Sequence, residues 1–271
     1  MRDMDTTVGR DIVVNFIVSV GIMFMWMWFA KLGSPRWFYE ISTKWLPWLV
    51  SAMCILMIVG IIWALLFLPP DYQQSFTTRI LVIHVAVAGT SLAFFPLMAV
   101  AGTITLVWKM KLADMVAKHA APLGAWFSFV TLATGSLWGS VMWGTWWEWT
   151  DARLVSMLFQ FFLLLSVVAL RSAIEDPDKS AKACALLSIV GCINVVIIKY
   201  SVEWWNVLHQ PSSPLSTSNE SANGPEFWMA TGVMILAVYL FFIVSLTLAT
   251  RNEILQRERR SQWVQEIVRT S

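Results

Sequence analysis

The chain has 271 residues, of which 58% are apolar and only 13% charged, and its formal net charge is +2. Soluble domains are typically about 45–50% apolar and about 25% charged, so this composition excludes a single soluble domain. The near balance of 19 basic and 17 acidic residues also excludes the basic face that nucleic-acid binding requires. We therefore expect a membrane protein embedded in the lipid bilayer, with no nucleic-acid partner.

Two interpretations fit the first 29 residues. Residues 12–29 form an 18-residue apolar stretch, which is long enough for an additional N-terminal membrane helix. Acidic residues precede this stretch and no small-residue cleavage site follows it, which argues against a secretory signal peptide. The other interpretation is that this stretch is not a membrane helix of the core fold: either Met25 or Met27 is the true start, or residues 1–26 are an extension.

Six later segments are continuously apolar and long enough to cross the roughly 30 Å hydrocarbon core as helices. Their apolar residues do not alternate with polar ones, which argues against β-strands. The segments are residues 46–68, 80–108, 120–139, 154–170, 184–198 and 229–250. The second is long for one span and is expected to tilt or to begin outside the hydrocarbon. The sequence therefore predicts an all-α polytopic membrane helix bundle with six transmembrane helices over residues 30–250, followed by a basic cytoplasmic tail at 251–271.

Basic residues are distributed unequally between the two sides of this predicted bundle. Fourteen Lys and Arg residues fall on one side and three on the other. The fourteen lie in the stretches 31–44, 109–118, 171–182 and 251–269. The three are Arg79, Arg153 and Lys199. Because basic residues concentrate in cytoplasmic loops, we place the fourteen in the cytoplasm or an organelle matrix and the opposite loops outside.

Tryptophan is the most unusual feature of the composition, with 17 residues against four tyrosines. Eight tryptophans fall in or beside the outer loops. Five of them lie in one stretch of twelve residues, 138–149, inside the tryptophan-rich outer loop 138–153. These five are Trp138, Trp143, Trp146, Trp147 and Trp149. An interfacial aromatic belt would spread its rings over many helix ends. The dense cluster therefore favours an aromatic platform for a large planar ligand, with the interfacial belt as the alternative.

The local conformation of this loop decides which of its side chains share a face. If the loop is helical, spacings of three and four residues place Trp143, Trp146 and Trp147 together. Arg153 then has two interpretations. It either holds an anionic group beside the aromatic platform, or it has a structural role in which it pairs with Asp151 or anchors to lipid headgroups.

Only three histidines are present, and two lie on the same side as the tryptophan-rich loop. His84 is at the outer end of the second span and His209 is in the third outer loop, whereas His119 is expected to be a solvated loop residue among cytoplasmic lysines. Imidazole is a common axial ligand of haem iron. Two imidazoles, an aromatic floor and a guanidinium together fit an amphipathic porphyrin. Arg153, and Arg79 near His84, are then candidates to neutralise its propionates.

Four ordered motifs identify a family resemblance that covers the chain from about residue 28 to the tail. They are Pro70-Asp-Tyr-Gln-Gln, Arg79-Ile-Leu-Val-Ile-His84-Val, Met142-Trp-Gly-Thr-Trp-Trp-x-Trp followed by Asp151-Ala-Arg-Leu, and Ile197-Ile-Lys-Tyr-Ser-Val-Glu-Trp-Trp-Asn-Val-Leu-His209-Gln-Pro. The tryptophan motif alone is typical of a wider haem-handling superfamily. With the other motifs and the short length, the chain resembles the CcmC family of the cytochrome c maturation system.

The resemblance implies a non-catalytic protein that binds haem at the outer face of the membrane. His84 and His209 would be the axial ligands, and the tryptophan-rich loop, with Asp151 and Arg153, would dock haem b as a transient cargo. The haem would pass to the periplasmic chaperone CcmE, alongside the ABC transporter subunits CcmA and CcmB and the small subunit CcmD. The implied location is the bacterial inner membrane, in preference to the mitochondrial one.

One departure from the family pattern concerns the loop itself. Thr150 stands between Trp149 and Asp151, where the family usually has none, and one extra residue would rotate a helix by about 100°. Two alternative functions remain open, a haem lyase subunit or a structural subunit of the haem-related ABC transporter complex. A permease is disfavoured because strongly polar residues such as Asn194 are rare inside the spans.

Overall fold

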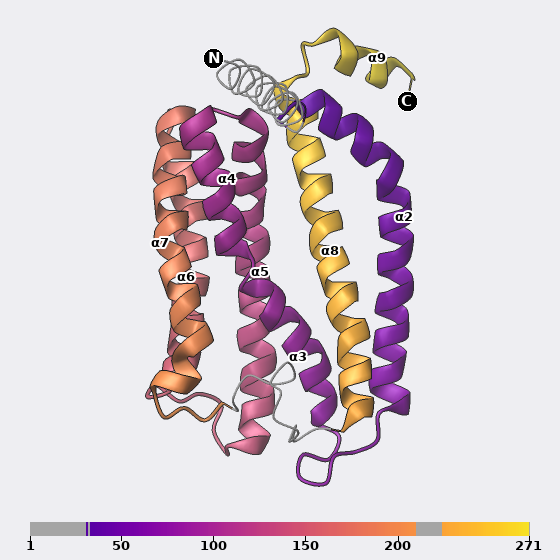
Figure 1. The fold of residues 1–271 in the computed structure, drawn as a ribbon, viewed down its shortest axis with the longest axis vertical. Helices are drawn as coiled ribbons and strands as arrows, with labels where there is room; N and C mark the ends of the chain where they lie inside the picture. Colours follow the sequence, from indigo (N-terminus) through magenta and orange to yellow (C-terminus); the bar gives the residue numbers. More distant parts are fainter. Residues whose placement is uncertain (1–30, 32, 210–223, 271) are drawn as a thin grey trace, which may run out of the picture.

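The computed structural model describes residues 31, 33–209 and 224–270. The predictions for residues 1–29 therefore lie outside the described residues. Within these residues every regular element is helical, and six segments are long and apolar enough to cross a membrane, which confirms the all-α polytopic fold (Figure 1). In chain order the elements are α2 (Pro35–Ile62), η1 (Trp63–Phe67), α3 (Thr78–Ser91), α4 (Phe94–Trp108), α5 (Lys111–Met142), α6 (Ala152–Ala173), α7 (Pro177–Trp204), α8 (Pro225–Arg257) and α9 (Gln262–Thr270).

The helices extend beyond the apolar segments because polar residues cap them outside the apolar stretch. Ser34, Asp151 and Asp176 each accept backbone N–H groups of the first turn that follows them, at α2, α6 and α7 respectively. Such caps satisfy N–H groups that have no partner within the helix. Hydropathy marks only the apolar length of a helix, whereas the caps decide where it begins.

The second predicted span is a pair of helices, α3 and α4, which change direction at Leu92 and Ala93 (Figure 1). The second predicted span is therefore interrupted by a turn, although α3 and α4 together still form one candidate span, Thr78–Trp108. Pro96 cannot donate to the carbonyl of Leu92, and its ring clashes with that carbonyl in a continuous helix. Gln160 of α6, which is fully buried, donates from Nε2 to the carbonyl of Ser91 at 3.1 Å. A break within apolar surroundings is tolerated where such a neighbour satisfies the freed backbone group.

Helix α5 lies at the centre of the bundle and packs against α3, α4, α6 and α8, while α2 packs against α8 (Figure 1). Phe94, Phe95 and Met98 of α4 are almost completely buried, as are Leu164 of α6 and Met234 of α8. These side chains hold α5 in a fixed position relative to its neighbours. Residues on α5 therefore face α3 on one side and α6 on another.

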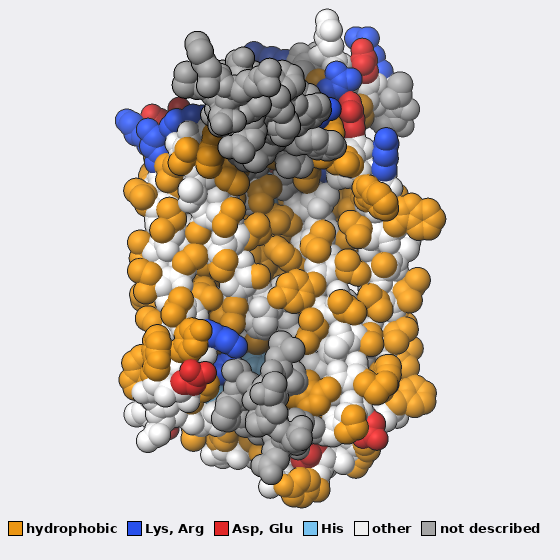
Figure 2. Space-filling view, in the orientation of Figure 1, with side chains coloured by type: hydrophobic (Ala, Val, Ile, Leu, Met, Phe, Trp, Pro, Cys, Tyr) orange, Lys and Arg blue, Asp and Glu red, His pale blue; other side chains and the backbone are white. Residues whose placement is uncertain are grey.

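The two ends of the bundle differ in side-chain chemistry. We call one the basic end, formed by the α4–α5 and α6–α7 connections and residues 251–270, and the other the loop end, formed by segments 69–77, 143–151 and 205–209. Figure 2 shows basic side chains gathered at the basic end, above a broad apolar band. The stretches that were expected to share one side of a membrane do lie at one end of the structure.

Candidate functional site

The tryptophan-rich loop is not helical, so the expectation that Trp143, Trp146 and Trp147 share a helical face is wrong. Helix α5 ends at Met142, and Gly144 follows with a φ of +72°, in the left-handed region that favours glycine. The next helix begins only after Asp151. A helix cannot continue through a left-handed residue, so the loop turns back against the end of α5.

Trp138, which is buried, and Trp143, which is half-buried, form a packed pair in the aromatic cluster. Their rings meet edge to face with 5.2 Å between centroids, and Trp138 is only 6% exposed. The indole Nε1 of Trp138 donates to Oε1 of Gln74 at 2.9 Å, and Gln74 is itself buried. This bond ties the end of α5 to the segment before α3. The cluster therefore has one wall fixed by packing and hydrogen bonding.

His209 lies against this wall. Its imidazole ring is 5.2 Å from the ring of Trp143, at an interplanar angle of 60°. The backbone N–H of the preceding residue, Leu208, donates to Oδ2 of Asp151 at 2.8 Å. The other carboxylate oxygen of Asp151 accepts the N–H groups of Arg153 and Leu154. Asp151 therefore caps α6 and at the same time holds the segment that carries His209.

His84 reaches the same region from α3 and lies against the backbone of α5. Its Nδ1 is 3.0 Å from the hydroxyl oxygen of Thr134. A Cβ atom at Gly135 would stand 2.9 Å from Cε1 of the ring, which is closer than such contacts allow. Only glycine at this position leaves room for the imidazole. The ring is thus held between a hydroxyl group and the bare backbone of α5.

The two imidazoles and Arg153 are electrostatic neighbours. The charge of Arg153 acts on both His84 and His209, and the charge of His84 acts on His209. Burial, followed by the charges of Arg153 and His84, lowers the pKa of the His209 imidazole to about 3. His209 is therefore neutral at physiological pH, which is the form that binds metal ions. The structure brings these three predicted residues together.

The alternative in which Arg153 pairs with Asp151 is not found. None of the ion pairs among the described residues includes Arg153, and its guanidinium is largely buried. Asp151 instead directs both carboxylate oxygens to backbone N–H groups. A buried guanidinium without a paired carboxylate is suited to an anionic ligand.

Trp146, Trp147 and Trp149 occupy the outer part of the loop. Trp146 is 64% exposed and Trp149 is 72% exposed, and the rings of Trp147 and Trp149 meet edge to face at 5.6 Å. The Nε1 of Trp147 is buried and has no hydrogen-bond partner among the described residues. The five tryptophans therefore divide into the packed pair Trp138 and Trp143 and an outer group of three.

The extra residue Thr150 is accommodated in a turn and does not rotate a helix. Its backbone N–H and its hydroxyl both donate to Oε1 of Glu148, at 3.0 and 2.9 Å. These two bonds lower the pKa of the Glu148 carboxyl below its usual value. The turn ends at Asp151, which caps α6 two residues before Arg153 in the sequence and accepts the backbone N–H of Arg153.

Arg79 is at the start of α3 and is held by the preceding segment. Its Nη2 donates to the carbonyl of Leu68 at 2.9 Å, and its guanidinium lies 4.5 Å from the ring centre of Phe76. Its Nε is buried without a partner within the described part of the chain. Arg79 thus fixes the segment that also contains Gln74, and one of its donors remains available.

The residues at the loop end supply the kinds of side-chain group that a haem molecule would need. Two imidazoles supply nitrogen ligands, tryptophan faces and edges supply apolar contact, and Arg153 supplies positive charge. The Nδ1 of His209 and the Nε1 of Trp147 are buried without partners in the described structure. Buried polar atoms are normally satisfied, so these two atoms are suited to a ligand that would supply their partners, although six other buried atoms elsewhere in the described residues, His119 Nε2 among them, share this state.

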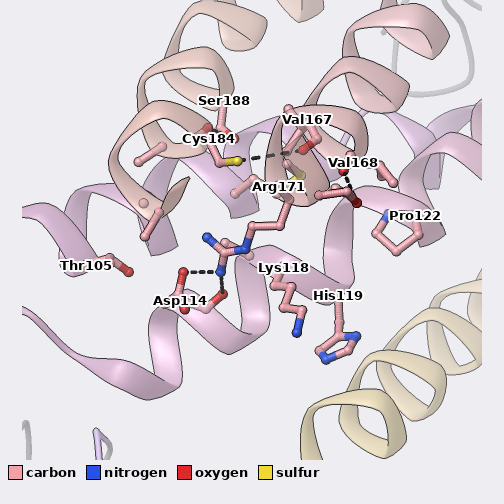
Figure 3. A pocket seen from close by; sticks show the side chains of 17 residues that line it. Thr105, Asp114, Lys118, His119, Pro122, Val167, Val168, Arg171, Cys184 and Ser188 are labelled. Carbon is pink, nitrogen blue, oxygen red and sulfur yellow. Dashed lines mark hydrogen bonds and ion pairs between the residues drawn. The ribbon is translucent and has the colours of Figure 1, made fainter. Parts of the chain in front are cut away.

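A second group of charged residues, at the basic end, escaped the sequence analysis. It surrounds a cavity of about 250 Å³ between α4, α5, α6 and α7, where Arg171 reaches from α6 to Asp114 on α5 (Figure 3). Glu253 of α8 binds Lys118 at 2.7 Å. His119 lies in α5, with Nε2 3.4 Å from Glu253, so its assignment as a solvated loop residue is wrong. No sequence pattern connects these positions, because they lie on three different helices.

Known proteins similar to this chain agree in name. The family model CcmC, described as heme exporter protein C, matches residues 28–265. A heme exporter protein C of Bradyrhizobium diazoefficiens is 46% identical over 87% of this chain and 88% of that protein. Proteins of the same name from Escherichia coli K12 and Haemophilus influenzae are 42% and 38% identical, over 90% and 91% of this chain and 98% and 99% of theirs.

Proposed function

Since this chain belongs to the CcmC family of heme exporter proteins, we propose that it binds haem at the loop end of the bundle and hands it to a periplasmic haem chaperone. Membership of this family supports a role in haem handling for cytochrome c maturation in the membrane. The finer proposal is that CcmE accepts the haem, that the cargo is haem b, and that no bond of the porphyrin is chemically changed by this chain.

One observation carries the proposal. His84 from α3 lies against Thr134 and Gly135 near the end of α5, and Asp151 holds both Leu208, beside His209, and the backbone of Arg153 at the start of α6. Trp143 lies against His209 and Trp138, at the end of α5. Four separate parts of the chain thus supply residue types that suit one amphipathic disc.

We assign these side chains distinct roles toward haem. His84 and His209 are the ligands of the iron, which requires an unprotonated ring nitrogen from each. The tryptophans contact the porphyrin, with Trp138 and Trp143 as the fixed wall and Trp146, Trp147 and Trp149 as the outer group. Arg153, and the free donor of Arg79, neutralise the propionates through charge-assisted hydrogen bonds. Asp151 acts on haem indirectly, because it positions His209 and Arg153.

The position of the site supports a particular orientation in the membrane. Cytoplasmic loops are rich in Lys and Arg, so the basic end belongs in the cytoplasm and the loop end on the opposite side. In a bacterial inner membrane the haem site then faces the periplasm, where a membrane-anchored chaperone can reach it. CcmA, CcmB and CcmD are the further partners that we propose for the assembled complex. The exposed outer tryptophans suit transfer, because a cargo in a sealed core could not leave.

The test is the absorption spectrum of the purified protein. We expect a Soret band in the wild type that is strongly weakened or shifted in His84→Ala and His209→Ala. His119→Ala is the matched control, because it removes the third histidine at the opposite end and should leave the band unchanged. Unchanged spectra in both of the first two variants would refute the ligand assignment. A band lost equally in all three would show that it reports folding and would also count against the proposal.

A further inference from the structure

Thr134 of α5 makes the one side-chain hydrogen bond that the structure shows for the His84 ring among the described residues. The hydroxyl oxygen of Thr134 lies 3.0 Å from Nδ1 of His84 and 2.7 Å from the backbone carbonyl oxygen of Val130. The carbonyl of Thr131 lies at 3.3 Å from the same hydroxyl. A threonine hydroxyl has one hydrogen to donate and two lone pairs with which to accept.

The direction of each bond follows from this count. A carbonyl oxygen can only accept, so the short contact to Val130 requires that the hydroxyl hydrogen point to that carbonyl. The hydroxyl oxygen then has only lone pairs to offer His84. Nδ1 must therefore carry the proton and donate it to Thr134, since two acceptors would repel each other at 3.0 Å.

We propose that Thr134 is a positioning residue that selects the tautomer of His84 in which Nε2 carries the free lone pair. In a neutral imidazole one nitrogen is protonated and the other is the ligand atom. With Nδ1 committed to Thr134, Nε2 is the nitrogen left to bind iron. This inference rests on the proposed function only for its consequence in haem binding, and the tautomer itself can be measured without haem.

The backbone of α5 supports the same arrangement from a second side. A Cβ atom at Gly135 would stand 2.9 Å from Cε1 of His84, 3.5 Å from Nδ1 and 3.8 Å from Nε2. The ring therefore lies closely on the helix surface with Cε1 nearest to it, and this contact limits how far the ring can move away from Thr134. Thr134 and Gly135 are adjacent in sequence, so one short stretch of α5 sets both the tautomer and the position of the ring.

A hydrogen bond to the second nitrogen also affects the iron. When Nδ1–H donates to an acceptor, the ring becomes more basic, and the loss of such a partner typically costs about 10-fold to 100-fold in metal affinity. A more basic ligand stabilises the oxidised iron, so loss of the bond should raise the reduction potential of bound haem. The Thr131 carbonyl also interacts with the His84 ring and no side-chain change removes it, so we expect the lower part of this range.

The experiment compares Thr134→Val with Thr134→Ser in the full chain. Valine keeps the shape of threonine and removes the hydroxyl, whereas serine keeps the hydroxyl. Thr103→Val is the matched control, because Thr103 donates to the carbonyl of Ala99 at 2.8 Å on α4 in the same helical manner but contacts no histidine. The first measurement is the ¹⁵N chemical shift of the His84 ring in haem-free protein, which distinguishes protonated from unprotonated Nδ1. The second is haem affinity and reduction potential.

We expect a protonated Nδ1 in the wild type and in Thr134→Ser, and a mixture of tautomers in Thr134→Val. Haem affinity should fall about tenfold and the potential should rise in Thr134→Val alone. A wild-type ring protonated on Nε2, or a Thr134→Val protein that matches Thr103→Val in all measurements, would overturn the inference. If His84→Ala leaves the haem spectrum unchanged while the ¹⁵N shifts are as expected, the proposed function fails and the tautomer assignment stands.

Discussion

The two ends of the bundle use polar side chains in opposite ways. At the basic end the charges pair with one another, since Asp114 binds Arg171 and Arg257, and Glu253 binds Lys118 and Arg257. At the loop end they do not. Asp151 binds only backbone N–H groups there, and Arg153 forms no ion pair with any described residue.

This difference agrees with our proposal that the loop end, and not the basic end, holds the ligand. At the basic end each of these charged groups already has a partner of opposite charge, so none of these charges is left to bind a cargo. At the loop end the Nδ1 of His209 and the Nε1 of Trp147 are buried without hydrogen-bond partners among the described residues, as is the Nε2 of His119 at the basic end. Each such atom costs about 1–3 kcal/mol of stability. A binding site can recover that free energy when a ligand supplies the missing partner.

The largest loss of stability is expected from a substitution at the basic end, and this substitution should leave haem binding unchanged. Asp114→Asn removes the carboxylate that holds Arg171 and Arg257, at a site where Asp114 is 14% exposed and Arg171 is 16% exposed. Breaking a buried ion pair typically costs about 3–5 kcal/mol, and we expect about 3 because Arg257 keeps Glu253. The check is a thermal unfolding scan in detergent, together with the Soret band of the folded fraction.

The control for Asp114→Asn is Lys179→Gln, which breaks an exposed pair with Asp176 on α7 and should change the unfolding temperature little. If Asp114→Asn altered the haem spectrum at temperatures where the protein remains folded, the separation between the two ends would be wrong.

An intermediate effect is expected from Asp151→Ala, which should reduce both stability and haem content. The substitution removes the cap of α6, worth about 0.5–2 kcal/mol, and releases Leu208 and with it His209. Asp176→Ala is a matched control, because Asp176 caps α7 through two N–H groups but holds no distant segment. Unfolding scans should show similar losses for the two variants, whereas haem content should fall only in Asp151→Ala. Equal haem content in both would mean that the bond to Leu208 does not position His209.

The smallest effect is the difference in haem affinity that we expect between two tryptophan variants. Trp143→Ala removes the ring that contacts both Trp138 and His209, whereas Trp146→Ala removes a ring that is 64% exposed. We expect Trp143→Ala to weaken haem binding about tenfold more, which corresponds to about 1.4 kcal/mol. Haem titration of the two purified variants measures this ratio. Equal losses of haem affinity would make the outer group as important as Trp143. No loss of affinity in either variant would favour the interfacial belt.

The six spans of the described residues, their helical nature and the gathering of basic residues at one end follow from the sequence, because each depends on local composition. Residues 229–250 form an apolar run wherever the chain folds around them, and α8 contains all of them. The clustering of basic residues is likewise readable in order along the chain. The tryptophan motif and the two histidines point to haem because their residue types are rare and chemically distinctive.

The break between α3 and α4, the ion pairs of the basic end and the surroundings of His84 are decided by tertiary structure. Gln160 lies 69 positions from Ser91, Glu253 lies 135 from Lys118 and Thr134 lies 50 from His84. A sequence pattern records spacing within one helix, whereas these contacts depend on which helices pack together and at what rotation. Hydropathy therefore determines where the chain crosses the membrane, and only the packing around α5 decides which polar atoms meet and which remain open to a ligand.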